Sequence, residues 1–78
     1  MVQILQHEKY GQIIYDENFL TGSKKLFIGG VQLPKLNRNT FIWDYNGENK
    51  TVVIKGNFLI GIRLVVDGIE IPLTTIAK

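Results

Sequence analysis

The side chains that could act as a nucleophile, a general base or a metal ligand are few in this sequence. The chain has no cysteine, and His7 and Ser23 are its only histidine and its only serine. A serine nucleophile needs a histidine and a carboxylate beside it, and a zinc site needs about four nitrogen, sulfur or oxygen ligands. Ser23 follows Gly22 in a segment typical of a turn, and His7 lies in an N-terminal segment of undecided structure. We therefore predict a non-enzymatic protein with no catalytic residue and no metal site.

The carboxylates show no spacing that would form a catalytic or calcium-binding group. Asp67 precedes Gly68, which is a turn signal, and Asp16-Glu17 stands at the expected end of a strand. A glycosidase needs a facing pair of carboxyl groups, and a calcium loop needs oxygen ligands at short regular intervals. Gly29-Gly30 lacks the strand, glycine-rich loop and helix that a phosphate site requires. No cofactor is predicted.

Three aromatic residues alternate along one expected strand, residues 40–45. Phe41, Trp43 and Tyr45 fall on one face at a period of two, where their rings could stack on a sugar, a base or a partner's side chain. The same row could instead fill the centre of a small core, which is the interpretation we favour. Binding of a small ligand or carbohydrate through Phe41, Trp43 and Tyr45 is the alternative.

The charged residues give little sign of a nucleic-acid partner. The formal net charge is +2, and the basic residues occur one or two at a time. Lys35, Arg38 and Lys50 border the aromatic strand without alternating with its rings, so the pattern argues against oligonucleotide binding. No apolar run approaches the roughly 20 residues of a membrane-spanning helix, and the first residues lack a signal-peptide pattern. We expect a soluble, cytoplasmic protein, which the absence of cysteine also fits.

A segment that occurs twice organises the chain. Asn18-Phe19-Leu20-Thr21-Gly22 and Asn57-Phe58-Leu59-Ile60-Gly61 each precede two apolar-alternating runs that end in proline. The period of 39 residues (57 − 18) is typical of a duplicated supersecondary unit. We predict repeat units at about 12–36 and 51–75, joined by the strand 40–45 within a single domain, 1–78. The repeated loop is expected to place Phe19 and Phe58 as plugs at the core end, or alternatively to form a paired binding site.

The strand pattern predicts an all-β fold. Apolar residues recur at a period of two, helical periodicity is absent, and Gly29-Gly30 and Asp67-Gly68 are hairpin signals. The expected strands are 12–16, 24–28, 31–36, 40–45, 51–55, 62–66 and 69–73. This arrangement favours an antiparallel β-sandwich of about seven short strands with an internal pseudo-twofold duplication.

Aligning the two copies assigns residues to the faces of the strands, since alternate side chains point to opposite sides. One face is apolar in both copies and is the predicted core: Ile13/Val52, Tyr15/Ile54, Leu26/Leu64, Ile28/Val66, Val31/Ile69 and Leu33/Ile71. The other face is mostly polar but has apolar positions at Ile14/Val53 and Phe27/Val65, to which Ile42 is added. If these side chains lie together, they form an exposed patch of the kind that marks an interface. The alternative is that they reflect β-propensity alone.

Part of the chain resembles the Fas apoptotic inhibitory molecule family. The resemblance covers about residues 22–71. It rests on Gly22-Ser23-Lys24-Lys25-Leu26-Phe27-Ile28-Gly29-Gly30, on an aromatic strand centred on Phe41, and on a closing Leu64-Val65-Val66-Asp67-Gly68-Ile69-Glu70-Ile71. It implies a non-enzymatic, two-sheet antiparallel domain that acts through protein contacts. The chain is also similar to small uncharacterised bacterial β-sandwich domains.

These patterns together favour an interaction module. We predict that the protein binds a protein partner, or itself as a homodimer, through the sheet face that carries Ile14, Phe27, Ile42, Val53 and Val65.

Overall fold

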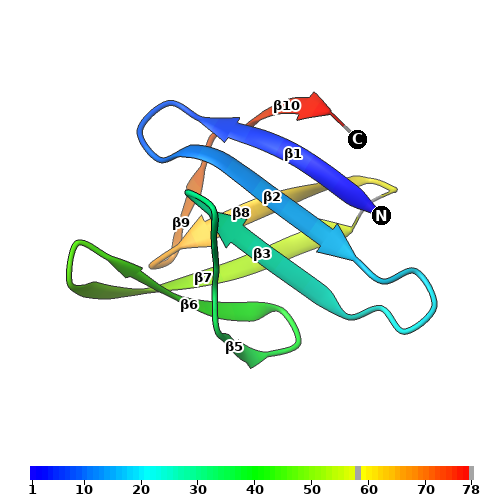
Figure 1. Ribbon diagram of the computed structural model, residues 1–78, viewed down its shortest axis with the longest axis horizontal. Coiled ribbons are helices and arrows are strands. Elements are labelled where there is room, and N and C mark those ends of the chain that lie inside the picture. Colours follow the sequence, from blue (N-terminus) through cyan, green and yellow to red (C-terminus); the bar gives the residue numbers. More distant parts are fainter. Residues whose placement is uncertain (58, 78) are drawn as a thin grey trace.

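The computed structural model describes residues 1–57 and 59–77, which form ten β-strands and no helix (Figure 1). In chain order the strands are β1 (Val2–His7), β2 (Gly11–Glu17), β3 (Lys24–Ile28), β4 (Val31–Gln32), β5 (Lys35–Asn37), β6 (Thr40–Tyr45), β7 (Glu48–Asn57), β8 (Gly61–Val66), β9 (Ile69–Ile71) and β10 (Thr74–Ala77). The predicted all-β class is confirmed. The expected number of about seven strands is too low, because the prediction omitted β1 and β10 and merged β4 with β5.

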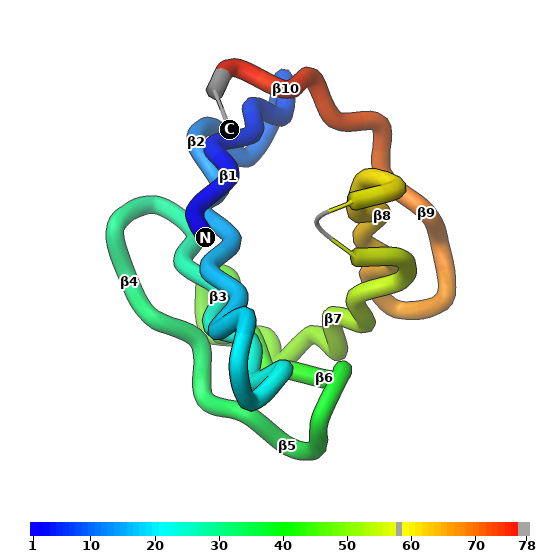
Figure 2. Tube along the Cα trace, turned by 90° about the vertical axis from the view of Figure 1, so that its right-hand side faces the viewer, coloured from blue at the N-terminus to red at the C-terminus, as the bar shows by residue number. Residues whose placement is uncertain are grey.

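The strands form two five-stranded antiparallel sheets. The first sheet has the order β10-β1-β2-β3-β4, and the second has the order β5-β6-β7-β8-β9. Figure 2 views the molecule from the right-hand side of Figure 1, with β1 to β4 of the first sheet at the left and β7 to β9 of the second at the right. β10 of the first sheet runs across the top, and β5 and β6 of the second lie at the bottom. The first sheet therefore contains four consecutive strands, β1 to β4, and the second contains five, β5 to β9. β10 returns from the end of the chain to pair with β1 in the first sheet.

The chain passes between the sheets next to its two prolines. The N–H of Leu33 donates to the carbonyl oxygen of Leu26 in the first sheet (2.9 Å), whereas the carbonyl oxygen of Pro34 accepts from the N–H of Ile42 in the second (2.9 Å). The single strand predicted over 31–36 is therefore wrong. The strand predicted over 69–73 likewise ends at Ile71, before Pro72. Proline has no N–H to donate to a ladder, so strands end where it stands.

Inward-facing side chains from both sheets form one buried cluster. Nine of the twelve predicted core residues are buried in it: Ile13, Tyr15, Leu26, Ile28, Leu33, Val52, Ile54, Leu64 and Val66. Ile71 is partly buried against the cluster. Leu5, Phe41, Trp43 and Ile62 complete it. The alternation of residues along β2, β3, β7 and β8 therefore predicted the inner faces correctly.

The prediction that Val31 and Ile69 belong to the core is wrong. Their exposed fractions are 66% and 69%. Val31 pairs with Ile28 and Ile69 pairs with Val66, so each stands at the hairpin end of a very short edge strand. An edge strand has no neighbouring strand on its far side to cover its side chains. The alternation of residues predicts which face of the sheet a side chain lies on, but it does not predict how deeply that side chain is buried.

Two hairpin turns have the backbone that their residues predict. Asn46 and Gly47 have φ angles of 52° and 83°, and Asp67 and Gly68 have φ angles of 49° and 83°. Positive φ at both central residues is the requirement of a type I′ turn, which Asn-Gly and Asp-Gly satisfy at low energetic cost. Asp67 also braces its turn against β7, because its Oδ1 accepts from the N–H of Thr51 (2.9 Å) and its own N–H donates to the carbonyl of Thr51 (2.9 Å).

Gly56 should be the glycine least tolerant of substitution. It has φ +84°, and a Cβ at this position would collide with the backbone carbonyl oxygen of Gly61 on the neighbouring strand. We expect Gly56→Ala to lower the free energy of unfolding by about 2–5 kcal/mol, from the strained φ together with overpacking. Gly29→Ala is the matched control, because Gly29 has φ +61° with no atom near the new Cβ, and it should lose only about 1–2 kcal/mol. Equal losses in urea unfolding would contradict the steric explanation.

Candidate functional site

The predicted interaction surface is divided between the two sheets. Ile14 and Phe27 are cross-strand partners on the outer face of the first sheet. Val53 and Val65 are partners on the outer face of the second, with Ile42 on the adjacent strand β6. All five side chains are half-buried. The five residues therefore form two separate patches, not the single patch that the sequence suggested.

The apolar group on the first sheet extends one strand further than predicted. Ile4 of β1 pairs with Ile14 and is also half-buried. Ile4, Ile14 and Phe27 thus form a row in register across β1, β2 and β3, which we call the first-sheet patch. Ile42, Val53 and Val65 form the second-sheet patch. The sequence missed Ile4 because residues 1–9 were left without an assigned strand.

The aromatic row is mainly part of the core. Phe41 and Trp43 are buried, and only Tyr45 is half-buried. Tyr45 and Trp43 both contact Tyr10 of the β1–β2 turn, with ring centroids 5.2 Å and 4.7 Å from that of Tyr10. This arrangement corresponds to the interpretation we favoured, in which the rings pack. A continuous ligand platform of Phe41, Trp43 and Tyr45 is not exposed.

His7 has a structural role in the same cluster. Its ring stacks on Tyr10 with centroids 4.6 Å apart, and its Nδ1 accepts hydrogen bonds from the N–H groups of Lys9 (3.0 Å) and Tyr10 (3.1 Å). The imidazole therefore provides the acceptor for two backbone N–H groups of the β1–β2 turn. Within the part of the chain that the structure describes, no nucleophile or carboxylate is hydrogen-bonded to His7, so its geometry is that of a turn-forming residue.

The repeated loop does not plug the core. Phe19 is exposed, which makes the prediction for this residue wrong, and Phe58 lies outside the described residues. In the first loop the Oδ1 of Asn18 accepts from the N–H groups of Leu20 (3.0 Å) and Thr21 (3.2 Å). The second loop has the same turn, in which the Oδ1 of Asn57 accepts from two backbone N–H groups. The repeated asparagine thus shapes a turn in which Phe19 and Leu20 of the first loop, and Leu59 and Ile60 of the second, are exposed.

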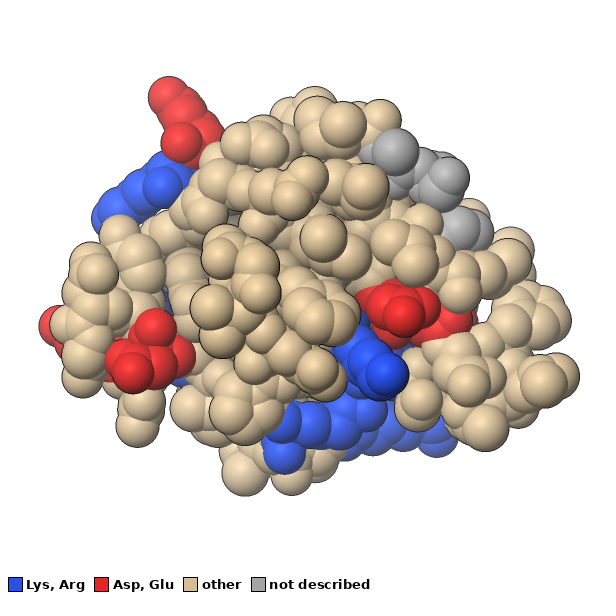
Figure 3. Space-filling view, in the orientation of Figure 1, with Lys and Arg blue, Asp and Glu red and all other residues tan. Residues whose placement is uncertain are grey.

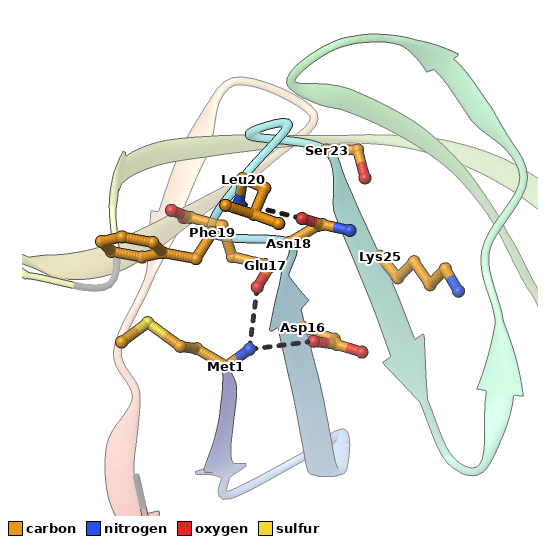
Figure 4. Close-up of a pocket in the computed structure, with 8 residues that line it drawn as sticks. All are labelled: Met1, Asp16, Glu17, Asn18, Phe19, Leu20, Ser23 and Lys25. Carbon is orange, nitrogen blue, oxygen red and sulfur yellow. Dashed lines mark hydrogen bonds and ion pairs between the residues drawn. The ribbon is translucent and has the colours of Figure 1, made fainter.

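A surface groove of about 400 Å³ lies at the base of the first loop (Figure 4). The amino group of Met1 donates to the carbonyl oxygen of Glu17 (2.8 Å) and lies 3.6 Å from Oδ1 of Asp16. In Figure 4 the side chains of Met1 and Phe19 extend to one side of the groove, and Lys25 lies on the other. The groove brings polar groups together at the base of a loop with apolar side chains. No nucleophile and base are in contact among the residues that line it, so it does not have the geometry of a catalytic site.

Tyr15 is the titratable group most affected by the fold. Burial raises the pKa of its phenol well above the ordinary value, and a hydrogen bond to the carboxylate of Glu17 and the negative charges of Glu17 and Asp16 raise it further. Its ring is packed in the core. The fold therefore favours the neutral phenol, and Tyr15 contributes its ring to the packing of the core.

No known protein family, curated protein or solved structure matches the chain. Among residues 1–57 and 59–77, no group of three or more histidine, cysteine or acidic side chains is close enough together to hold a metal ion. The part of the chain that the structure describes has no helix long and apolar enough to cross a membrane. The candidate site is therefore defined by surface shape and side-chain chemistry alone.

Replacing His7 tests its role in the β1–β2 turn. His7→Ala should lower the free energy of unfolding by about 1–3 kcal/mol beyond the loss of ring packing, because two backbone N–H groups lose their acceptor. His7→Asn is the matched variant, since an asparagine oxygen accepts the same pair of donors in both repeated loops of this chain. His7→Asn should therefore be the more stable of the two in urea unfolding. Equal stability would show that the hydrogen bonds contribute little.

The raised pKa of Tyr15 predicts how stability depends on alkaline pH. The folded state favours the neutral phenol, so this contribution is fully present below the ordinary tyrosine pKa of about 10 and is lost as pH rises above it. The melting temperature of the wild type should fall above about pH 10, and Tyr15→Phe should show a shallower fall because it has no phenol to ionise. Identical slopes in the two proteins would contradict the assignment.

Proposed function

We propose that the protein is a non-enzymatic interaction module that binds another protein chain, or a second copy of itself, through the outer face of a sheet. The observation that carries this proposal is the first-sheet patch, in which Ile4, Ile14 and Phe27 stand in register across three adjacent strands. The outer face of an antiparallel sheet is usually polar where it faces water. A row of three apolar side chains departs from that pattern.

The surroundings of the patch support binding of a chain more than binding of a small molecule. Along β2 and β3, Ile14 and Phe27 are followed in register by the pair Asp16 and Lys25, and Gln32 lies beyond Phe27 on β4. An apolar centre with a polar margin is the composition of protein interfaces. The second-sheet patch is bordered in the same way, since Thr40 pairs with Val53 and Glu70 pairs with Val65.

We infer that the duplication predicted from the sequence also extends to this surface. We infer that the two sheets form a sandwich related by a pseudo-twofold axis. In support of this, β2, β3 and β4 follow one another in the first sheet as β7, β8 and β9 do in the second. The pair Ile14 and Phe27 then corresponds to the pair Val53 and Val65. The resemblance to the Fas apoptotic inhibitory molecule family implies the same class of function and stays a prediction.

Polar substitution of each patch tests the proposal. Phe27→Ser and Val65→Ser should keep the circular-dichroism spectrum of the wild type, because both side chains are only half-buried. We expect the wild type to sediment as a dimer or to retain a protein partner on an affinity column. Phe27→Ser should weaken that association by at least about tenfold in Kd, as expected for a residue at the centre of an interface.

The control for this experiment is Val31→Ser, which removes an exposed apolar side chain outside both patches. This variant should associate like the wild type. Val65→Ser reports separately on the second sheet. A chain that stays monomeric and retains the same proteins whether or not the patches are intact would contradict the proposal.

A further inference from the structure

Four large apolar side chains are exposed at the tips of the two repeated loops. The exposed fractions are 68% for Phe19, 94% for Leu20, 80% for Leu59 and 78% for Ile60. We call these residues the apolar tips. Exposed apolar side chains that occur singly need no explanation, but here an adjacent pair occurs in each of the two repeated loops, and Leu20 and Leu59 stand at equivalent positions.

The local backbone holds these side chains outward. In each loop one asparagine Oδ1 accepts two backbone N–H groups, with donor-to-acceptor distances from 2.9 to 3.2 Å. The first loop is also closed by the N–H of Gly22, which donates to the carbonyl of Asn18 (2.7 Å). These hydrogen bonds hold the turns closed through backbone groups and the asparagine side chains. The apolar tips do not take part in them, so the stability of the turns does not explain why the tip residues are apolar.

Both tips lie at the same end of the molecule. β2 runs into the first loop and β3 leaves it, as β7 and β8 do for the second loop. The two loops project at the right of Figure 1, and Figure 2 looks directly at this end. The turns that follow β3 and β8 lie at the opposite end, where Val31 and Ile69 are exposed. The two ends can therefore be compared within one protein.

Basic side chains stand behind the tips. Lys24 and Lys25 begin β3 directly after the first loop, and Arg38 approaches Gly22 so closely that a Cβ there would lie 2.8 Å from its Nη2. Behind the second loop, Lys55 and Arg63 are exposed and directly opposite each other on β7 and β8. Figure 3 shows basic side chains along the lower margin of the molecule, and acidic side chains beside them at the foot of the uncharged loop that projects at the right. Asp16 and Glu17 at the end of β2 directly precede the first loop, so both signs of charge occur behind this tip.

The like-charged pair behind the second tip favours an anionic partner. Facing lysine and arginine side chains on adjacent strands repel each other. Within residues 1–57 and 59–77, an ion pair is formed by Arg63, with Glu70 at 4.0 Å, and none is formed by Lys55. The equivalent positions in the first copy are Asp16 and Lys25, which attract. A nearby anionic surface would remove the repulsion between Lys55 and Arg63.

We propose that this end of the molecule docks on the surface of a lipid bilayer that contains anionic lipids. The apolar tips enter the boundary between headgroups and acyl chains, and the basic residues behind them contact the headgroups. The convex shape of the tips favours a bilayer over a protein, because a fluid interface accepts protruding side chains without a matching pocket. This inference does not depend on the sheet patches, whose residues lie within the strands and not in the two loops.

Vesicle sedimentation tests the proposal. The probes are phosphatidylcholine vesicles with and without about one third phosphatidylserine, at low and at high salt. We expect the wild type to bind the anionic vesicles and to be released by salt. The double variants Phe19→Ser/Leu20→Ser and Leu59→Ser/Ile60→Ser should each weaken binding by at least about tenfold, since each removes two apolar side chains from the contact.

Matched controls separate this role from general changes in the surface. Val31→Ser/Ile69→Ser removes two exposed apolar side chains at the opposite end and should bind like the wild type. Lys55→Gln/Arg63→Gln should weaken binding to anionic vesicles, whereas Lys9→Gln in the β1–β2 turn should not. Unchanged circular dichroism and melting temperature would show that every variant is folded, as expected for exposed positions.

Three results would overturn the proposal. One is a wild type that stays in the supernatant with anionic vesicles, and another is equal loss of binding in the tip variants and the Val31/Ile69 control. The third is a change in oligomeric mass caused by the tip substitutions in the absence of lipid, which would assign the tips to a protein interface. None of these results bears on the effect of Phe27→Ser on protein association, so the two proposals can fail separately.

Discussion

The fold depends on the requirement that each sheet bury its apolar face against the other. Neither sheet can shield its own inner residues, and the thirteen buried apolar side chains from both sheets form a single cluster. A shift of one residue in the pairing of β2 with β3 would turn Ile13 and Tyr15 outward and bring Ile14 into the core. The backbone crossing between Leu33 and Pro34 then links the sheets covalently, and the return of β10 to β1 links them again.

The sequence predicted those parts of the fold that follow from local rules. Alternation along β2, β3, β7 and β8 predicted which side chains face the core, and Asp67-Gly68 predicted the positive φ angles of its turn. Both features depend on residues that are close together in the chain. The sheet to which a strand belongs depends on contacts distant in sequence. Alternation continues across Pro34, so the segment 31–36 resembled one strand although its two halves pair in different sheets.

β1 shows why the site was harder to predict than the core. Its inner face consists of Gln3, Leu5 and His7, so two polar side chains are buried where apolar residues would normally mark the strand. Only the completed fold shows that His7 accepts backbone N–H groups and stacks on Tyr10. Without β1, Ile4 could not be placed beside Ile14, and the first-sheet patch lacked one of its three members.

The apolar surface residues fall into two groups that folding explains to different degrees. Ile14, Phe27, Val53 and Val65 lie in strands, where β-branched and aromatic residues are favoured even on a face turned to solvent. Leu20 and Ile60 lie in turns, where Gly, Asn, Asp and Ser are the usual residues and side chains contribute no packing. Burial in the core and β-propensity therefore both fail to account for the tips, and this is the reason for proposing that they contact an apolar medium outside the protein.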